Sequence, residues 1–183
     1  MTASPAGRLR LFFALWPDPP ARATLAGLAA AVAHARTGRA TPPAALHVTL
    51  AFLGAGEASL LPLAAAAGAA AAGMATPFTV SFDLPGGPGR GGIAWLGCTA
   101  PADGLVDLHS GLAGALAARG LPVEQRTYRP HVTLARDCRR PAPDHGPGIT
   151  PVSWWADRLA LVASTGGAGG PTYRTLHAWP LQG

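Results

Sequence analysis

The sequence predicts an α+β fold, arranged as a single bilobal domain over residues 1–183 in which one strand and helix pattern occurs roughly twice. The tetrapeptide His-Val-Thr-Leu occurs at His47–Leu50 and again at His131–Leu134, 84 positions later. Hydrophobic residues make up 49% of the chain and charged residues only 13%, which favours a compact globule over a disordered chain. The length and the spacing of the repeat predict two similar lobes that share one cleft.

Apolar segments bounded by proline and glycine define the elements of the first half. Arg8–Trp16 is apolar enough for a buried strand, and a proline-rich turn leads from it into a helix over Ala21–Arg36. Ala45–Leu53 is the strand that carries the first repeat. The alanine content of Glu57–Met74 predicts a second helix, and the alternating pattern of Phe78–Leu84 predicts another strand.

The second half follows a similar order. Five glycines and two prolines predict a mobile loop over Pro85–Gly92, followed by a strand at Ile93–Cys98 and a third helix over Pro101–Arg119. A short strand is expected at Val123–Arg126, before the strand of the second repeat at Pro130–Ala135.

The chain is expected to close with a loop and two strands. Asp137–Gly148 is rich in proline, glycine and charge, which predicts a loop. Strands are expected at Ala156–Ala163 and Tyr173–Trp179, with a glycine-rich turn at Gly166–Gly170 between them.

Charge and cysteine content limit the environment and the partners. The net charge is +5 and all fourteen cationic residues are arginine, which suits an anionic or nucleic-acid partner but equally a solvated surface. Cys98 and Cys138 lie far apart, so the sequence indicates neither a disulfide framework nor a zinc site. The apolar segments Leu11–Trp16 and Leu60–Ala72 are too short for a signal peptide core or a membrane span. We therefore expect a cytoplasmic protein with no membrane segment.

The repeated tetrapeptide offers the same two functional groups in each copy. Side chains alternate along a strand, so His47 and Thr49 share one face, as do His131 and Thr133. Two imidazoles facing one cleft can act as base and acid in the same reaction, which suits phosphoryl transfer. The threonine hydroxyls can hold the non-bridging phosphate oxygens, and no metal or other cofactor is then required. The alternative is that local hydrogen bonds satisfy each pair and that neither has a catalytic role.

Arginine and aromatic side chains near the repeats supply further candidates. Five arginines fall within the fifteen residues from Arg126 to Arg140, and among them Arg136 is either a phosphate ligand or a solvated charge. Arg139 and Arg140 are interpreted as exposed loop charges. Phe52 is either a core residue, the usual place for an aromatic residue in a strand, or a platform for stacking a base.

Other functional classes find little support. The remaining histidines have no second ligand at metal-binding spacing and are interpreted as structural: His34, His109, His145 and His177. Ser153 and Ser164 lack the Gly-x-Ser-x-Gly turn of a hydrolase nucleophile, and Pro85–Gly92 lacks the lysine of a nucleotide P-loop.

The motifs together resemble a known family. The paired His-x-Thr strands are similar to those of the 2H phosphoesterase superfamily. The resemblance extends over nearly the whole chain, through Arg10–Trp16, His47–Gly54, Trp95–Gly97, Arg129–Arg136 and Tyr173–Leu181. Within the superfamily, these segments resemble the bacterial and archaeal RNA 2',3'-cyclic phosphodiesterases, historically called 2'-5' RNA ligases.

This resemblance implies a fold, a reaction and a partner. The fold would have two antiparallel sheets facing a central groove, with helices packed outside. The reaction would hydrolyse a terminal 2',3'-cyclic phosphate on RNA to a 2'-phosphomonoester without metal or cofactor, with 2'-5' RNA ligation as its reverse. His47 would protonate the leaving 3'-oxygen and His131 would activate water, while Thr49, Thr133 and Arg136 would hold the phosphate. Phe52 completes the candidate substrate-binding residues, and we expect a monomer.

Two alternatives remain open at the level of the sequence. The same site would also suit a small cyclic nucleotide, a cyclic phosphate of ADP-ribose or a 2'-5' linked oligonucleotide. A protein of another class, an RNA-binding module whose histidines contact phosphate without catalysis, is less favoured, because plain binding needs arginines and aromatic residues rather than a matched acid and base.

Overall fold

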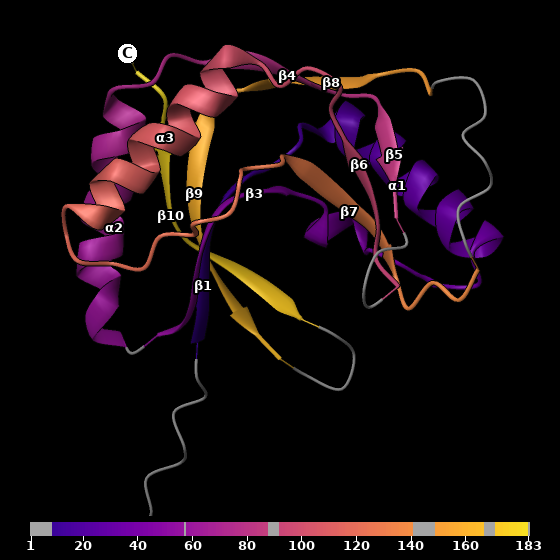
Figure 1. Ribbon diagram of the computed structural model, residues 1–183, viewed down its shortest axis with the longest axis horizontal. Coiled ribbons are helices and arrows are strands. Elements are labelled where there is room, and N and C mark those ends of the chain that lie inside the picture. Colours follow the sequence, from indigo (N-terminus) through magenta and orange to yellow (C-terminus); the bar gives the residue numbers. More distant parts are fainter. Residues whose placement is uncertain (1–8, 57, 88–91, 141–148, 167–170, 183) are drawn as a thin grey trace, which may run out of the picture.

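The computed structural model describes residues 9–56, 58–87, 92–140, 149–166 and 171–182 (Figure 1). Its strands are β1 (Leu9–Leu15), β2 (Arg39–Ala40), β3 (Val48–Gly56), β4 (Phe78–Phe82), β5 (Leu84–Gly86), β6 (Ala94–Gly97), β7 (His131–Arg136), β8 (Val152–Ala156), β9 (Arg158–Thr165) and β10 (Thr172–Pro180). Its α-helices are α1 (Pro19–Ala35), α2 (Leu61–Gly73) and α3 (Asp103–Ala117). Pro43–Ala45 and Ala58–Leu60 form short 3-10 turns.

The strands of the two halves form one continuous antiparallel sheet. Its order is β10-β9-β1-β3-β7-β6-β5, with β2 also paired to β7, and a separate two-stranded sheet joins β4 to β8. The two halves meet where β3 pairs with β7 at Val48 and Val132. The expected α+β class with two antiparallel sheets is confirmed, and the strands that carry the two repeats are direct neighbours.

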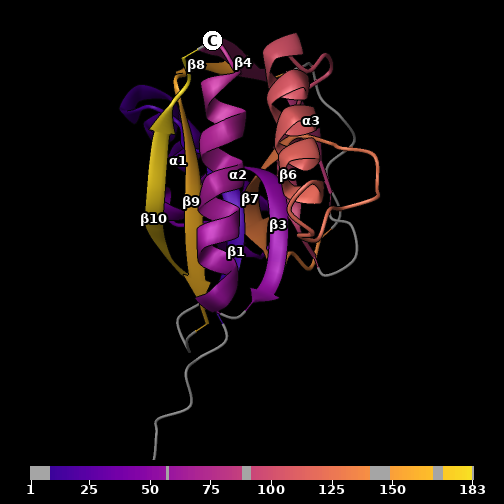
Figure 2. The same cartoon turned by 90° about the vertical axis from the view of Figure 1, so that its left-hand side faces the viewer.

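The helices cover the outer faces of the sheet. Helices α2 and α3 lie side by side, with α2 against β9 and β10 and α3 against β3 (Figure 2). Helix α1 packs on β2 and β7 in the other half (Figure 1). Asp18 caps α1 by accepting a hydrogen bond of 2.8 Å from the Ala21 amide. The buried face of α1 repeats every four residues, at Ala21, Leu25, Ala29 and Ala33.

The central strands separate the core from the groove face. On β1, Leu11, Phe13 and Leu15 are buried in the main core beneath the helices. Phe12 and Ala14, which point to the opposite face, belong to a second, smaller cluster. The alternation of side chains along a strand thus gives β1 two apolar faces, as expected for a strand in the middle of the sheet.

Several element predictions need correction. No strand forms at Val123–Arg126, where Glu124 and Arg126 instead make an exposed ion pair of 2.7 Å. Strand β8 was not predicted, and the strand expected from Ala156 begins at Arg158. The Pro85–Gly92 loop begins with two residues of β5, and β2 occupies part of the connection after α1. Short strands depend on partners that are distant in sequence, so local pattern is a weak guide to them.

Some predictions fall on parts of the chain that the structure does not describe. They concern residues 88–91 of the glycine-rich loop, residues 141–148, which include His145, and residues 167–170 of the last turn. In the described parts of the chain, no helix combines the length and the apolar character needed to cross a membrane.

Candidate functional site

The two repeats lie beside each other in the sheet. Val48 and Val132 form the antiparallel pair that joins β3 to β7, and both are fully buried toward the core. The residues on either side of this pair therefore point to the opposite, groove face. Extending the antiparallel register by one residue makes these cross-strand neighbours: His47 with Thr133, and Thr49 with His131. Such neighbours have Cβ atoms about 5 Å apart, so the two imidazoles and two hydroxyls form one compact group.

Both imidazoles are held by the same local hydrogen bond. Nδ1 of His47 lies 2.7 Å from the Ala45 carbonyl oxygen, and Nδ1 of His131 lies 2.9 Å from the Arg129 carbonyl oxygen. A carbonyl only accepts, so Nδ1 donates in each ring and Nε2 is left for the groove. Nε2 of His47 lies 3.1 Å from the Thr49 hydroxyl. In the neutral ring this nitrogen accepts, so the Thr49 hydroxyl donates to it.

Three aromatic rings surround His47. The ring centroids of Phe12, Trp16 and Tyr173 lie 5.0, 5.4 and 5.3 Å from that of the imidazole. Phe12 and Trp16 come from β1 and the residue just after it, and Tyr173 comes from β10. The strands β10, β9, β1 and β3 make up the first lobe, and those from β7 to β5 make up the second. His47 is therefore enclosed by side chains of the first lobe, although it lies at the junction of the two lobes.

This enclosure changes the protonation of His47. Burial away from water lowers its pKa from 6.5 to about 4, because the charged imidazolium loses hydration. The hydrogen bond to Ala45 opposes the shift, whereas the positive charges of Arg136 and His131 add to it. His47 is consequently neutral near pH 7 in the free protein.

His131 lies in a more open environment. Its side chain is exposed, and Trp95 of β6 is its aromatic neighbour, with ring centroids 6.1 Å apart. Thr133 and Arg136 on the same strand are half-buried. The two identical tetrapeptides therefore present one enclosed and one exposed imidazole to the same groove.

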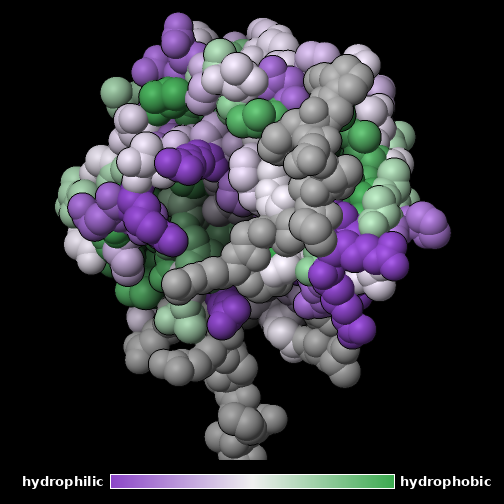
Figure 3. Space-filling view, turned by 45° about the vertical axis from the view of Figure 1, so that its right-hand side comes forward, coloured by the Kyte–Doolittle hydropathy of each residue, from purple (hydrophilic) through white to green (hydrophobic). Residues whose placement is uncertain are grey.

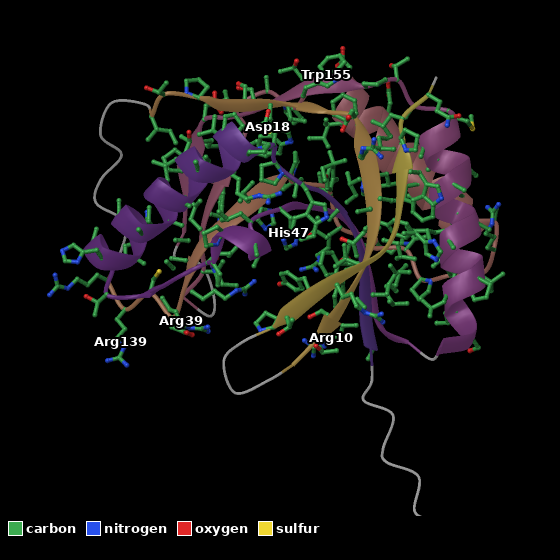
Figure 4. All side chains as sticks on the ribbon, turned by 180° about the vertical axis from the view of Figure 1, so that it is seen from behind. Arg10, Asp18, Arg39, His47, Arg139 and Trp155 are labelled. Carbon is green, nitrogen blue, oxygen red and sulfur yellow. The ribbon has the colours of Figure 1, made fainter. Side chains whose placement is uncertain are left out.

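Two adjoining hollows open around His47. The first has a volume of about 560 Å³, and its lining includes Arg10, His47, Thr49, Phe52, Arg136 and Tyr173. The second, of about 40 Å³, is bordered by His47, Thr133 and Arg136, with Arg39 at its edge. Figure 3 shows hydrophobic surface between areas of hydrophilic side chains. In the view of Figure 4, Arg10 and Arg39 lie on opposite sides of His47. Five of the six candidate residues line these hollows, and the sixth, His131, adjoins them through its cross-strand neighbour Thr49.

The interpretation of Phe52 as a core residue is wrong. Its side chain is 51% exposed and lines the first hollow. The cause is one bulge, since β1 pairs Ala14 with Thr49 but Phe12 with Phe52, so β3 carries an extra residue between these two pairs. An extra residue reverses the alternation of faces. Phe52 therefore points to the groove together with Thr49, rather than to the core.

Four side chains that frame the site were not predicted from the sequence. Arg10, Phe12 and Trp16 lie on one face of β1 or just beyond it, and Tyr173, the second residue of β10, lies near Phe12. The alternation in β1 was visible in the sequence. However, the apolar run indicated burial on both faces, and nothing local showed that one face borders a groove.

A second aromatic contact supports the strand of the first repeat. The Tyr128 hydroxyl donates to the Thr49 carbonyl oxygen at 3.2 Å, and its ring stacks on His109 at a centroid distance of 3.8 Å. His109 in turn contacts the Leu50 carbonyl oxygen through Nδ1 at 2.9 Å. This histidine is thus structural, as expected from the sequence, and it ties α3 to β3.

Comparison with known proteins places the chain among phosphoesterases. A family model described as the 2'-5' RNA ligase superfamily matches residues 16–168. An RNA 2',3'-cyclic phosphodiesterase of Thermus thermophilus is 32% identical over 182 residues, which cover 96% of this chain and 91% of the relative. A protein of the same name from Escherichia coli is 33% identical over 174 residues, covering 94% and 96%.

Solved structures agree with the sequence relatives. Escherichia coli LigT in complex with 3'-AMP has a TM-score of 0.80 and 31% identity, and the match covers 94% of this chain and 98% of that one. The protein TT0787 of Thermus thermophilus also has a TM-score of 0.80 and 31% identity, with coverage of 95% and 98%. The fold and the arrangement of its elements are therefore shared along nearly the full length.

Proposed function

The chain belongs to the 2'-5' RNA ligase superfamily, and from that premise we propose that it opens the 2',3'-cyclic phosphate at the end of an RNA strand to leave a 2'-phosphomonoester. The relatives from Thermus thermophilus and Escherichia coli are named for this activity. The observation that carries the proposal is the antiparallel register at Val48 and Val132, which gathers both His-x-Thr pairs on one face. A scissile phosphate bound there would meet a base, an acid and two hydroxyl donors.

Each step of the reaction uses a group that the geometry provides. His131 removes a proton from water, whose oxygen attacks phosphorus. The bond between phosphorus and the 3'-oxygen breaks, and His47 gives its Nε2 proton to that oxygen. Thr49 and Thr133 donate hydrogen bonds to the non-bridging oxygens, and Arg136 adds positive charge beside them. The assignment of acid and base follows the superfamily, because the two tetrapeptides are identical.

The low pKa of His47 constrains how it obtains the proton. In the free protein, burial and the charge of Arg136 keep this imidazole neutral near pH 7. A bound phosphate brings a negative charge next to Nε2 and offsets the field of Arg136, and both changes favour the imidazolium. We propose that His47 takes up its proton together with the substrate, so that the acid is charged only in the complex.

A hydrolysis assay tests the proposal. The protein is incubated with EDTA and an oligoribonucleotide that ends in a 2',3'-cyclic phosphate, and the 2'-phosphate product is measured. We expect ring opening by the wild type and losses of about 100-fold or more in kcat for His47→Ala and for His131→Ala, the usual scale for a lost general acid or base. His177→Ala, an exposed histidine on β10, is the matched control and should retain activity.

Two outcomes would refute the assignment. One is a wild-type protein that opens no ring, or does so only after metal is added. The other is near-normal turnover in either of the two histidine variants.

A further inference from the structure

A third hollow continues from the candidate site along the second lobe. It has a volume of about 640 Å³, and its charged or titratable lining residues are His34, Arg39, Asp137 and Arg139. Arg39 also borders the second hollow, which His47 and Thr133 line, so one arginine side chain is common to both hollows. In Figure 4, Arg39 lies between His47 and Arg139 in projection, and a group of hydrophilic side chains gathers at the lower right of Figure 3. Anionic groups that extend from the reacting phosphate would therefore meet a basic surface.

The backbone around this hollow is held in an unusual conformation. Within the described residues, Thr37 and Asp137 are the only non-glycine residues with positive φ, at 49° and 58°, and both line the hollow. Such conformations are strained and persist only where their surroundings enforce them. The Arg139 and Arg140 amides donate to the Arg36 carbonyl at 3.0 and 3.1 Å, which ties the end of β7 to the end of α1. The floor of the hollow is thus formed before any ligand arrives.

The charges favour a phosphate-bearing ligand. Arg39 and Arg139 are exposed cations, and Asp137 is the only carboxylate among the lining residues. Its ion pair with Arg39, at 3.2 Å, is largely exposed, so solvent weakens it and a phosphate can compete for the arginine. Guanidinium groups match phosphate oxygens in shape as well as charge.

We infer that the third hollow binds the sugar-phosphate backbone of an oligoribonucleotide whose reacting end occupies the site at His47. The inference rests on the proposed function and adds the place where RNA backbone beyond the reacting end is bound. The backbone bound there is either the strand that carries the cyclic phosphate or a second strand whose 5'-hydroxyl replaces water. In the second case the 5'-oxygen attacks phosphorus, the 3'-oxygen leaves with a proton, and a 2'-5' bond forms.

The first experiment measures the effect of substrate length. kcat/KM is determined in EDTA for a nucleoside 2',3'-cyclic phosphate and for an eight-nucleotide RNA with the same end. We expect Arg139→Gln to lower the value for the eight-nucleotide RNA by about three- to tenfold, as for one lost charged contact at an exposed site, and to leave the mononucleotide value unchanged. In Arg139→Gln, kcat/KM for the eight-nucleotide RNA should also fall less steeply with rising salt concentration, because one fewer phosphate is neutralised.

Arg158→Gln is the matched control, since Arg158 is an exposed arginine at the start of β9 and lines none of the three hollows. It removes the same charge and should leave the length dependence intact, whereas Arg139→Lys should retain part of it. Turnover of the mononucleotide by Arg139→Gln shows that this variant is folded and that the proposed function stands.

A second experiment distinguishes the two strands. A short RNA with a 5'-hydroxyl and an ordinary 3' end is added to the cyclic mononucleotide, and the 2'-5' joined product is measured. Loss of joining in Arg139→Gln assigns the hollow to the second strand, and loss of the length effect assigns it to the substrate strand. The inference is overturned if Arg139→Gln changes neither the effect of RNA length on kcat/KM nor the amount of joined product. It is also overturned if Arg158→Gln changes these two quantities as much as Arg139→Gln does. Absence of turnover of both the mononucleotide and the eight-nucleotide RNA by the wild type would instead overturn the proposed function.

Discussion

His47 and His131 belong to identical tetrapeptides but experience different surroundings. Aromatic rings from β1, β10 and the residue after β1 enclose His47, whereas His131 is exposed. The difference arises from position in the sheet, because His47 faces aromatic rings of the first lobe and His131 begins β7 in the second. The fold therefore distinguishes two groups that the sequence repeats without change, and burial strongly lowers the pKa of the enclosed one.

The buried imidazole predicts a pH dependence of stability. The pKa of His47 is about 4 in the folded protein and about 6.5 when unfolded, so between these values the unfolded state binds the extra proton. Stability that is fully present above pH 6.5 is therefore lost as the pH falls toward 4. We expect urea denaturation to show that, between pH 7.5 and 4, the free energy of unfolding of the wild type falls by at most about 3 kcal/mol more than that of His47→Gln. Equal losses in the two proteins would show that His47 is not desolvated.

At the scale of elements, the predictability of the site depends on distance along the chain. Alternation within each tetrapeptide placed His47 with Thr49 and His131 with Thr133, because adjacent residues of one strand decide it. Phe52 lies only five residues beyond His47, yet a bulge that arises from the pairing of β1 with β3 reverses its face. Strands β2 and β8 are likewise defined by β7 and β4, which lie far from them in sequence. Local pattern carries no information about such partners.

Close packing of α2 against the sheet predicts opposite effects for two similar substitutions. A Cβ atom at Gly68 would lie 2.6 Å from a ring carbon of Trp179 and 2.7 Å from one of Phe13. Gly68→Ala should therefore destabilise the protein by about 1–3 kcal/mol, despite the better helix propensity of alanine. Gly114→Ala on α3 is the control, because a methyl group added there would meet nothing within 4 Å, and it should stabilise by about 0.5–1 kcal/mol. Urea denaturation measures the change in the free energy of unfolding for both variants. Equal changes would contradict the close packing of α2 against Trp179 and Phe13.

At the scale of the molecule, the two halves of the chain exchange their helices. Helix α1 follows β1 in sequence but packs on β7 and β2, whereas α3 follows β6 and packs on β3 and α2. Helices α1 and α3 therefore each pack on a strand that lies in the other half of the chain. Residues of both halves line the groove at the junction. The geometry of the groove therefore depends on the packing between the two halves.

This exchange predicts that the chain unfolds as one cooperative unit, as expected for a single bilobal domain. Calorimetry should show one transition with equal calorimetric and van't Hoff enthalpies. Leu25→Ala on α1 and Leu112→Ala on α3 remove fully buried side chains on opposite lobes, and each should cost about 2–5 kcal/mol. Unfolding of either lobe would expose the apolar surface of the other lobe to water. Each variant should therefore shift the whole transition to lower temperature without splitting it. Two resolved transitions, only one of which moves in each variant, would show that the lobes fold independently and that the groove joins separate domains.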